Sequence, residues 1–150
     1  MKAALRFHKI AAWVWILMGM AHLAGHIFSE LNPPGSSQEA ELMKTMQGFP
    51  IPDPLFGTRS MLQIYHGLSL TFSAMSILWG LACLAAVKGG GSLEFLRRMM
   101  WLNTAACAAL LALCFVYFIL PPTTFVAAAL VCALLAQRRL PGNKDTAAGV

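Results

Sequence analysis

Met61-Leu62-Gln63-Ile64-Tyr65-His66-Gly67-Leu68-Ser69-Leu70 begins an apolar stretch that runs on to Val87, and this stretch decides the fold of the chain. No Asp, Glu, Lys or Arg interrupts it, and a helix needs only ~20 apolar residues to cross the hydrocarbon of a bilayer. One set of polar or small residues recurs every three or four positions and so shares one helix face: His66, Ser69, Ser73, Ser76, Gly80 and Cys83. Because lipid cannot hydrogen-bond these side chains, we expect this face to pack against other helices.

The composition indicates an integral membrane protein whose main partner is the lipid bilayer. The 150 residues are 58% hydrophobic and 11% charged, whereas soluble domains average about 25% charged residues. The net charge of +5 comes from cations in short segments beside apolar runs, a pattern typical of topology signals rather than of nucleic-acid binding. The four cysteines lie inside apolar runs without a Cys-x-x-Cys pair, so we interpret them as small apolar side chains.

Four apolar segments predict an all-α fold, a bundle of four transmembrane helices at about 5–29, 61–87, 94–120 and 123–138. These form one transmembrane domain over 1–140, with an outer loop at 30–60 and a flexible cytoplasmic tail at 141–150. Lys and Arg cluster before the first segment, between the second and third, and after the fourth, so the positive-inside rule places both termini in the cytoplasm. The first segment resembles a secretory signal, but it lacks a good cleavage site and we expect it to be retained.

The segments between the helices carry their own local signals. Ser36-Ser37-Gln38-Glu39 resembles a capping box and predicts a short helix over Ala40–Met46, lying over the bundle mouth or at the lipid interface. We expect Phe49–Phe56, which is rich in proline, to be extended and held by its apolar side chains. Pro121-Pro122 predicts a tight reversal between the third and fourth helices.

A layer of polar side chains is the candidate functional site. At ~1.5 Å per residue, His22, His26 and His66 lie ~5–10 Å below the outer ends of their helices, and Cys114 reaches a similar depth from its own helix. Ser69, Ser73 and Tyr117 are candidates for lining the same cavity. Such groups are costly in hydrocarbon unless they find partners, which favours a site here. His8, by contrast, is expected to be solvated or to lie at headgroup level at the cytoplasmic interface.

Three interpretations of this layer remain open. His22 and His66 are candidates for the two axial ligands of a b-type haem. His22, His26, His66 and Cys114 together are candidates for a copper or zinc site. Alternatively, the histidines hydrogen-bond Ser69, Ser73, Tyr117 or a backbone carbonyl and fix the register of neighbouring helices.

Other residues predict helix packing. Four glycines are expected to permit close approach of helices: Gly19, Gly25, Gly67 and Gly80. Asn103 and Thr104 are expected to form interhelical hydrogen bonds. Glu94 is spaced to pair with Arg97 and Arg98 at the start of the third helix.

The second helix also carries a resemblance. Arg59-Ser60 followed by Tyr65-His66-Gly67-Leu68-Ser69-Leu70 resembles a group of small, uncharacterised bacterial four-span membrane proteins, whose second span opens with Arg and Ser and then an aromatic-x-Gly-x-Ser-Leu run. The resemblance implies a four-helix fold in the bacterial cytoplasmic membrane, and it implies no catalytic residue.

The sequence contains no nucleophile elbow, P-loop, dinucleotide fingerprint or kinase motif. We therefore favour a non-enzymatic accessory or assembly subunit that binds a larger membrane complex or its own copies. The first alternative is the histidine-based haem or metal module. The second is a small-molecule-binding membrane protein or enzyme with its cavity between the first two helices.

Overall fold

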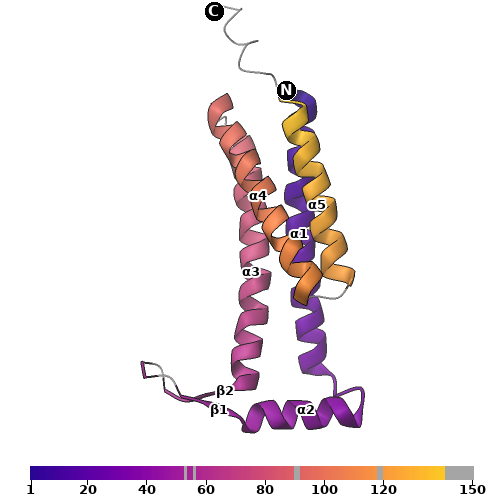
Figure 1. Ribbon diagram of the computed structural model, residues 1–150, viewed down its shortest axis with the longest axis vertical. Helices are drawn as coiled ribbons and strands as arrows, with labels where there is room; N and C mark the ends of the chain where they lie inside the picture. Colours follow the sequence, from indigo (N-terminus) through magenta and orange to yellow (C-terminus); the bar gives the residue numbers. More distant parts are fainter. Residues whose placement is uncertain (53, 56, 90–91, 118–119, 141–150) are drawn as a thin grey trace, which may run out of the picture. The chain divides into compact units, whose positions relative to one another are not determined.

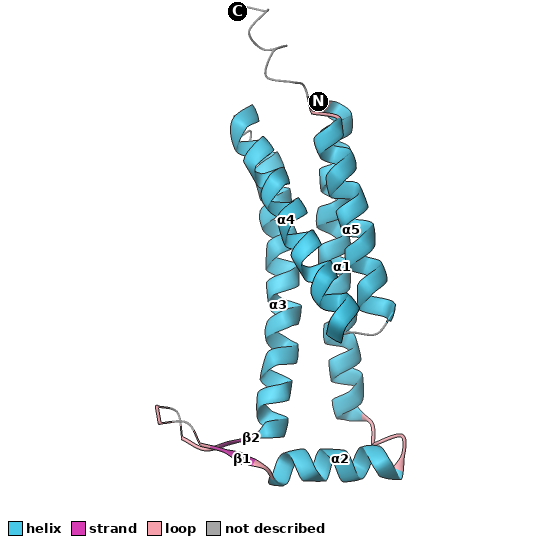
Figure 2. Ribbon diagram, in the orientation of Figure 1, coloured by secondary structure: helices cyan, strands magenta, loops and turns pink. Residues whose placement is uncertain are grey.

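The computed structural model describes residues 1–140 apart from 53, 56, 90, 91, 118 and 119, and it describes their side chains except at 117, 120 and 121. The described chain is almost entirely helical (Figures 1 and 2), in the order α1 (Lys2–Leu31), α2 (Ser37–Gly48), β1 (Pro50–Ile51), β2 (Arg59–Ser60), α3 (Met61–Lys88), α4 (Leu93–Tyr117) and α5 (Leu120–Arg138). The all-α prediction is therefore confirmed. The predicted tail at 141–150 lies outside the described residues.

Three of these helices, α1, α3 and α4, are long and apolar enough to cross a membrane. The apolar part of α5, Pro122–Arg138, is shorter than the other three. The length and composition of three predicted spans are thus confirmed, while a fourth crossing stays a prediction.

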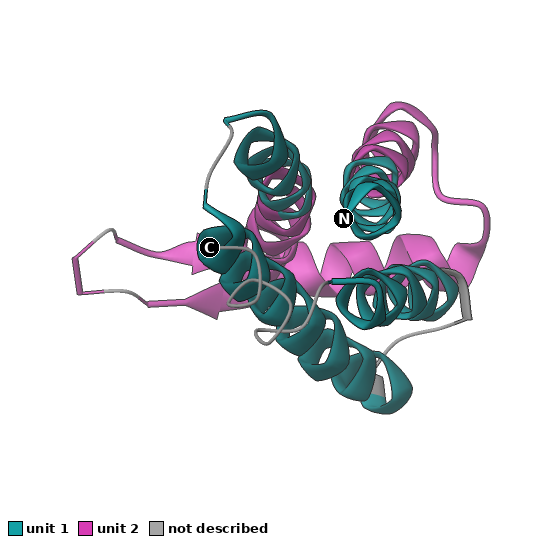
Figure 3. Ribbon diagram, turned by 90° about the horizontal axis from the view of Figure 1, so that it is seen from above, with its two compact units in different colours: residues 1–18, 76–150 teal, residues 19–75 magenta. Residues whose placement is uncertain are grey.

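The described chain divides into two compact units (Figure 3). Unit 1 comprises Met1–Met18 and Ser76–Val150, and unit 2 comprises Gly19–Met75. The long helices α1 and α3 contribute residues to both units. The predicted single transmembrane domain stays a prediction.

Close contact in unit 1 occurs where α3 carries a glycine. A Cβ atom added at Gly80 would lie only 2.6 Å from the carbonyl oxygen of Ala12 and 2.6 Å from Ile16 Cγ1. Gly80 therefore permits the approach of α1 that the sequence predicted. The same prediction is wrong for Gly25 and Gly67, where nothing among the described residues lies within 4 Å of an added Cβ.

Small and unbranched side chains fill the end of unit 1 where α1 begins and α5 ends. Ala4, Met100 and Ala136 are fully buried there, and Leu5, Phe7 and Leu140 pack around them. Nearby, Gln137 Nε2 on α5 donates to Thr104 Oγ1 on α4 at 2.7 Å and to the Met100 carbonyl at 3.3 Å. The predicted interhelical role of Thr104 is confirmed.

The centre of unit 1 is a polar junction around Asn103. Its Oδ1 atom accepts hydrogen bonds from Trp15 Nε1 on α1 at 3.1 Å and from Trp79 Nε1 on α3 at 3.0 Å. Asn103 has no exposed surface. One carboxamide therefore connects three helices, as expected for a polar residue inside an apolar helix bundle.

The two prolines of the predicted reversal lie inside a helix instead. α5 begins at Leu120, so Pro121 and Pro122 occupy its first turn. The first turn of a helix tolerates proline because the missing N–H has no intrahelical acceptor in that position. The predicted reversal at Pro121-Pro122 is therefore wrong.

Unit 2 contains the hydrophilic segment, and its short helix forms as predicted. Ser36 is the N-cap of α2, its Oγ accepts a hydrogen bond from Glu39 N at 3.2 Å, and Glu39 Oε2 in turn accepts one from Gly35 N at 2.7 Å. These reciprocal bonds satisfy backbone donors that a helix start leaves open. Within unit 2, α2 lies across the ends of α1 and α3 (Figure 1).

The proline-rich stretch is extended at β1, as predicted, but a different interaction holds it. β1 pairs antiparallel with β2, with Pro50 opposite Ser60 and Ile51 opposite Arg59. Phe49 and Leu55, which were expected to anchor the stretch, are 57% and 82% exposed. Backbone pairing between the two strands therefore holds β1, where the Ile51 side chain is half-buried.

Candidate functional site

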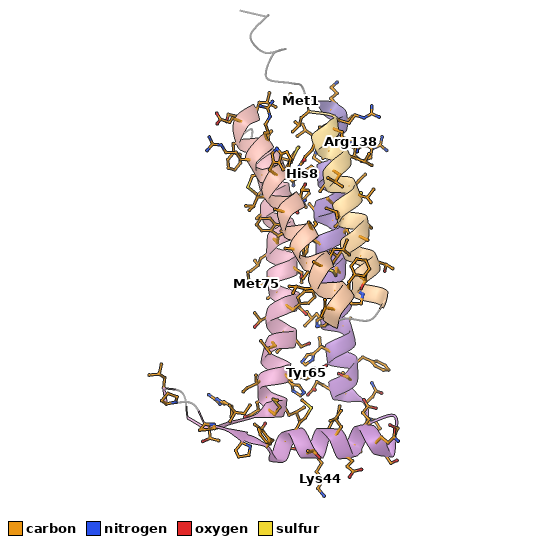
Figure 4. The ribbon with its side chains drawn as sticks, viewed as in Figure 1. Met1, His8, Lys44, Tyr65, Met75 and Arg138 are labelled. Carbon is orange, nitrogen blue, oxygen red and sulfur yellow. The ribbon has the colours of Figure 1, made fainter. Side chains whose placement is uncertain are left out.

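The histidines of unit 2 lie on facing turns of α1 and α3. On α1, His22, His26 and Glu30 are spaced four residues apart, so each side chain lies one turn after the last. On α3, His66 and Ser69 are three residues apart and share a face. The cluster lies toward the end of unit 2 that carries α2, near Tyr65 (Figure 4).

Two polar contacts connect these helices. His22 Nε2 and Ser69 Oγ are joined by a hydrogen bond of 3.0 Å. One turn further along, His66 Nε2 lies 3.2 Å from Glu30 Oε1. Among the interpretations left open by the sequence, the His22–Ser69 bond is of the kind in which a histidine hydrogen-bonds a serine of the neighbouring helix.

Ring contacts complete the histidine cluster, which we define as His22, His26, Glu30, His66 and Ser69. The rings of His26 and His66 meet edge to face, with centroids 5.2 Å apart and an interplanar angle of 79°. The His22 ring packs in the same way against Phe72, at 5.0 Å and 78°. The rings of His26 and His66 therefore meet, whereas His22 contacts Ser69 and Phe72, and a common level for the three imidazoles stays a prediction.

The cluster is open on one side. The side chain of His66 is 27% exposed and that of Glu30 is 45% exposed. His22 is exposed, and His26 is half-buried. Each of these side chains is thus at least partly accessible from outside unit 2. The open side of the cluster is thus a place where a polar molecule, water or a second protein can reach the imidazoles.

The other predicted site residues do not join the cluster in the described structure. Ser73 is buried, but its Oγ donates to the Ser69 carbonyl of its own helix at 3.1 Å, so it does not bind a histidine. Tyr117 ends α4, and its side chain lies outside the described part of the chain. Cys114 is buried in unit 1, and its membership of a common layer with the histidines stays a prediction.

Metal or haem ligation gains no support from this geometry. Among the described residues, no group of three or more His, Cys, Asp or Glu side chains is arranged to hold a metal ion. A haem between His22 and His66 would need one nitrogen from each ring, yet Nε2 of His22 contacts Ser69 and Nε2 of His66 contacts Glu30. The described arrangement is a hydrogen-bonded contact between two helices.

His8 is the clearest error of the sequence analysis. It was expected to be solvated or to lie at headgroup level, yet it has no exposed surface in unit 1. Neither ring nitrogen makes a hydrogen bond of normal geometry within the described structure, although the Cys83 backbone is close enough to interact with the ring. Figure 4 labels His8 further along the ribbon than Met1. The helix begins at Lys2, so His8 lies nearly two turns inside it, on the face that packs.

Two tryptophans were also missed as polar residues. Both Trp15 and Trp79 donate to Asn103, although the sequence pattern predicts no polar partner for either indole. A buried indole N–H usually finds an acceptor, so tryptophans deep in an apolar segment signal a nearby acceptor. Asn103 Nδ2 and Ser76 Oγ, both buried, have no partner among the described residues.

No protein-family model, no curated protein and no solved structure matches this chain. Function must therefore be inferred from the contacts described above.

Proposed function

We propose that this chain is a four-span protein of the bacterial cytoplasmic membrane that acts as a non-enzymatic accessory or assembly subunit. It binds a larger membrane complex or other copies of itself through its helix faces. α5 supports a fourth span because its 19 residues extend about 28 Å, close to the ~30 Å of hydrocarbon. The distribution of Lys and Arg supports cytoplasmic termini, with α2 and the hairpin outside.

The observation that carries the association is the outer face of α4. Four alanines lie exposed on it at helical spacing: Ala105, Ala108, Ala109 and Ala112. Phe115 and Val116, 75% and 71% exposed, follow at its end. Within membranes, faces of small residues are typical of helix–helix contacts because they let two backbones approach closely. This face therefore fits a helix of another subunit.

The test is the assembly state of the full chain extracted from membranes in mild detergent. Native mass spectrometry of the wild-type protein is expected to show an oligomer or a stoichiometric complex. The double variant Ala108→Leu and Ala112→Leu should reduce that species, because two isobutyl side chains in place of methyl groups separate the helices. The matched control is Ala128→Leu, at an exposed position on α5, and it should leave the assembly intact. A wild-type protein that is only monomeric under these conditions contradicts the proposal.

The topology has its own test. Reporter fusions after Lys44 and after Arg139 should show opposite sides of the membrane, with the Lys44 fusion outside. The proposal places three crossings, α3, α4 and α5, between these positions. Both reporters on the same side of the membrane would contradict it.

A further inference from the structure

One end of unit 1 is strongly cationic. It joins the start of α1, the end of α3, the start of α4 and the end of α5 (Figures 1 and 4). The described Lys and Arg residues of unit 1 all belong to these helix ends: Lys2, Arg6, Lys9, Lys88, Arg97, Arg98, Arg138 and Arg139. The single acidic residue described in unit 1 is Glu94. A charge imbalance of this size attracts anions to this end of the unit.

A groove of about 900 Å³ lies along α4 at this end. Its charged part is lined by Glu94, Arg97 and Arg98, and its apolar part by Trp101, Leu102 and Ala105. Arg97 and Ala105 are eight positions apart, which corresponds to about 12 Å along the helix axis. The groove therefore changes from cationic to apolar over the length of a lipid headgroup and its first methylenes.

The chemistry of the lining suits a phosphate attached to an acyl chain. Guanidinium groups bind phosphate oxygens through paired N–H donors. Trp101 is 59% exposed, and tryptophan rings are enriched at the headgroup level of membranes. Leu102 and Ala105 offer an apolar wall beyond the indole. Each part of an amphiphile thus meets a side chain of matching polarity.

Glu94, the one carboxylate that lines the groove, forms an ion pair with Arg98, and both side chains stay exposed. Arg98 Nη2 binds Glu94 Oε1, and these side chains are 78% and 69% exposed. An ion pair this exposed contributes little stability and exchanges readily for another anion. Two guanidiniums against one carboxylate leave the groove net positive, which favours an anionic headgroup over a zwitterionic one.

We propose that the α4 groove binds the headgroup phosphate of an anionic phospholipid, with Arg97 and Arg98 on the phosphate and Trp101 beside the glycerol region. The inference rests on the proposed membrane-spanning fold. It goes beyond general attraction of cations to anionic membranes because it assigns the binding to one groove.

The test measures lipid retention by the full-length protein. The protein is reconstituted into vesicles of phosphatidylcholine that contain phosphatidylglycerol and is then analysed by native mass spectrometry. The measured quantity is the ratio of phosphatidylglycerol to phosphatidylcholine that stays bound to the protein. The double variant Arg97→Gln and Arg98→Gln should lower this ratio by up to about 30-fold, from a roughly fivefold factor per cation near an anionic surface. The matched control Arg138→Gln and Arg139→Gln removes the same charge from the same end but outside the groove, and should lower it far less.

A second variant acts in the opposite direction. Glu94→Gln removes the competing carboxylate and should raise the ratio, and an increase is not a consequence of misfolding. Equal losses in the groove variant and its control, or no increase with Glu94→Gln, overturn the assignment. So does equal displacement by millimolar inorganic phosphate, since the site would then bind free phosphate.

Membrane integration of each variant is checked by resistance to alkaline extraction. If the variants are integrated into the membrane but do not show the expected lipid ratios, lipid binding in the groove is refuted and the membrane fold is not. Loss of integration in the wild-type protein refutes the membrane fold instead.

Discussion

Replacing Asn103 by leucine removes the acceptor on which three helices of unit 1 meet. Leucine has nearly the same volume, so the substitution leaves little cavity. It leaves two indole N–H groups without their acceptor: that of buried Trp15, 3.1 Å from Asn103 Oδ1, and that of half-buried Trp79, 3.0 Å from it. The substitution thus isolates the contribution of two interhelical hydrogen bonds.

The expected cost follows from the number of bonds and their surroundings. Interhelical hydrogen bonds within a membrane average about 0.6 kcal/mol, so two give about 1.2 kcal/mol. An unpaired buried donor in a soluble protein costs about 1–3 kcal/mol, which sets a higher limit. Asn103 Nδ2 is itself buried without a partner, and its removal recovers part of the loss. We expect Asn103→Leu to lower the free energy of unfolding by about 1–2 kcal/mol.

Reversible unfolding in mixed micelles, followed by far-ultraviolet circular dichroism, measures this cost. Trp15→Phe and Trp79→Phe each remove one donor, and each should cost less than Asn103→Leu. In the leucine background, each should lose its hydrogen-bond contribution of about 0.6 kcal/mol. Leu102→Ala, at an exposed neighbouring position on α4, serves as the control and should change little.

Two results would refute the reasoning. The first is an unfolding free energy for Asn103→Leu within about 0.3 kcal/mol of the wild-type value, which is the usual error of additivity. The second is an equal cost of each tryptophan substitution in both backgrounds, because coupled residues must lose their interaction energy once the shared acceptor is gone.

Three further predictions concern single positions. Gly80→Ala should destabilise the fold by about 1–3 kcal/mol in the same unfolding assay, since its Cβ would meet the Ala12 carbonyl, whereas Gly67→Ala meets open space and should not. Ser36→Ala should cost about 1 kcal/mol of local stability at α2, seen as faster amide exchange confined to that helix, and unchanged exchange would contradict its role as N-cap. His66→Gln should lower stability by no more than about 1 kcal/mol, because its contact with Glu30 is part-exposed. The wild-type protein should show no Soret band that this substitution removes, and such a band would revive the haem interpretation.

The sequence by itself determined where the helices lie. Continuous apolar runs longer than a bilayer is thick predict α1, α3 and α4, because a chain in hydrocarbon must satisfy its backbone internally. Local hydrogen bonding likewise determined the start of α2, where Ser36 and Glu39 act within one turn. Features that depend on neighbours in the chain could therefore be predicted.

Which side chains meet depends on how the helices pack against one another. Along an almost uniformly apolar helix, the pattern of residues identifies the inward face poorly, so His8 was placed in solvent or at headgroup level although it is buried. For the same reason, the hydrogen bonds from two indoles to Asn103 could not be predicted. Nor could the open space beside Gly25 and Gly67. The contacts of His22 with Ser69 and of His66 with Glu30 depend on the register between α1 and α3. That register arises from the packing of whole helices, which no short stretch of sequence contains.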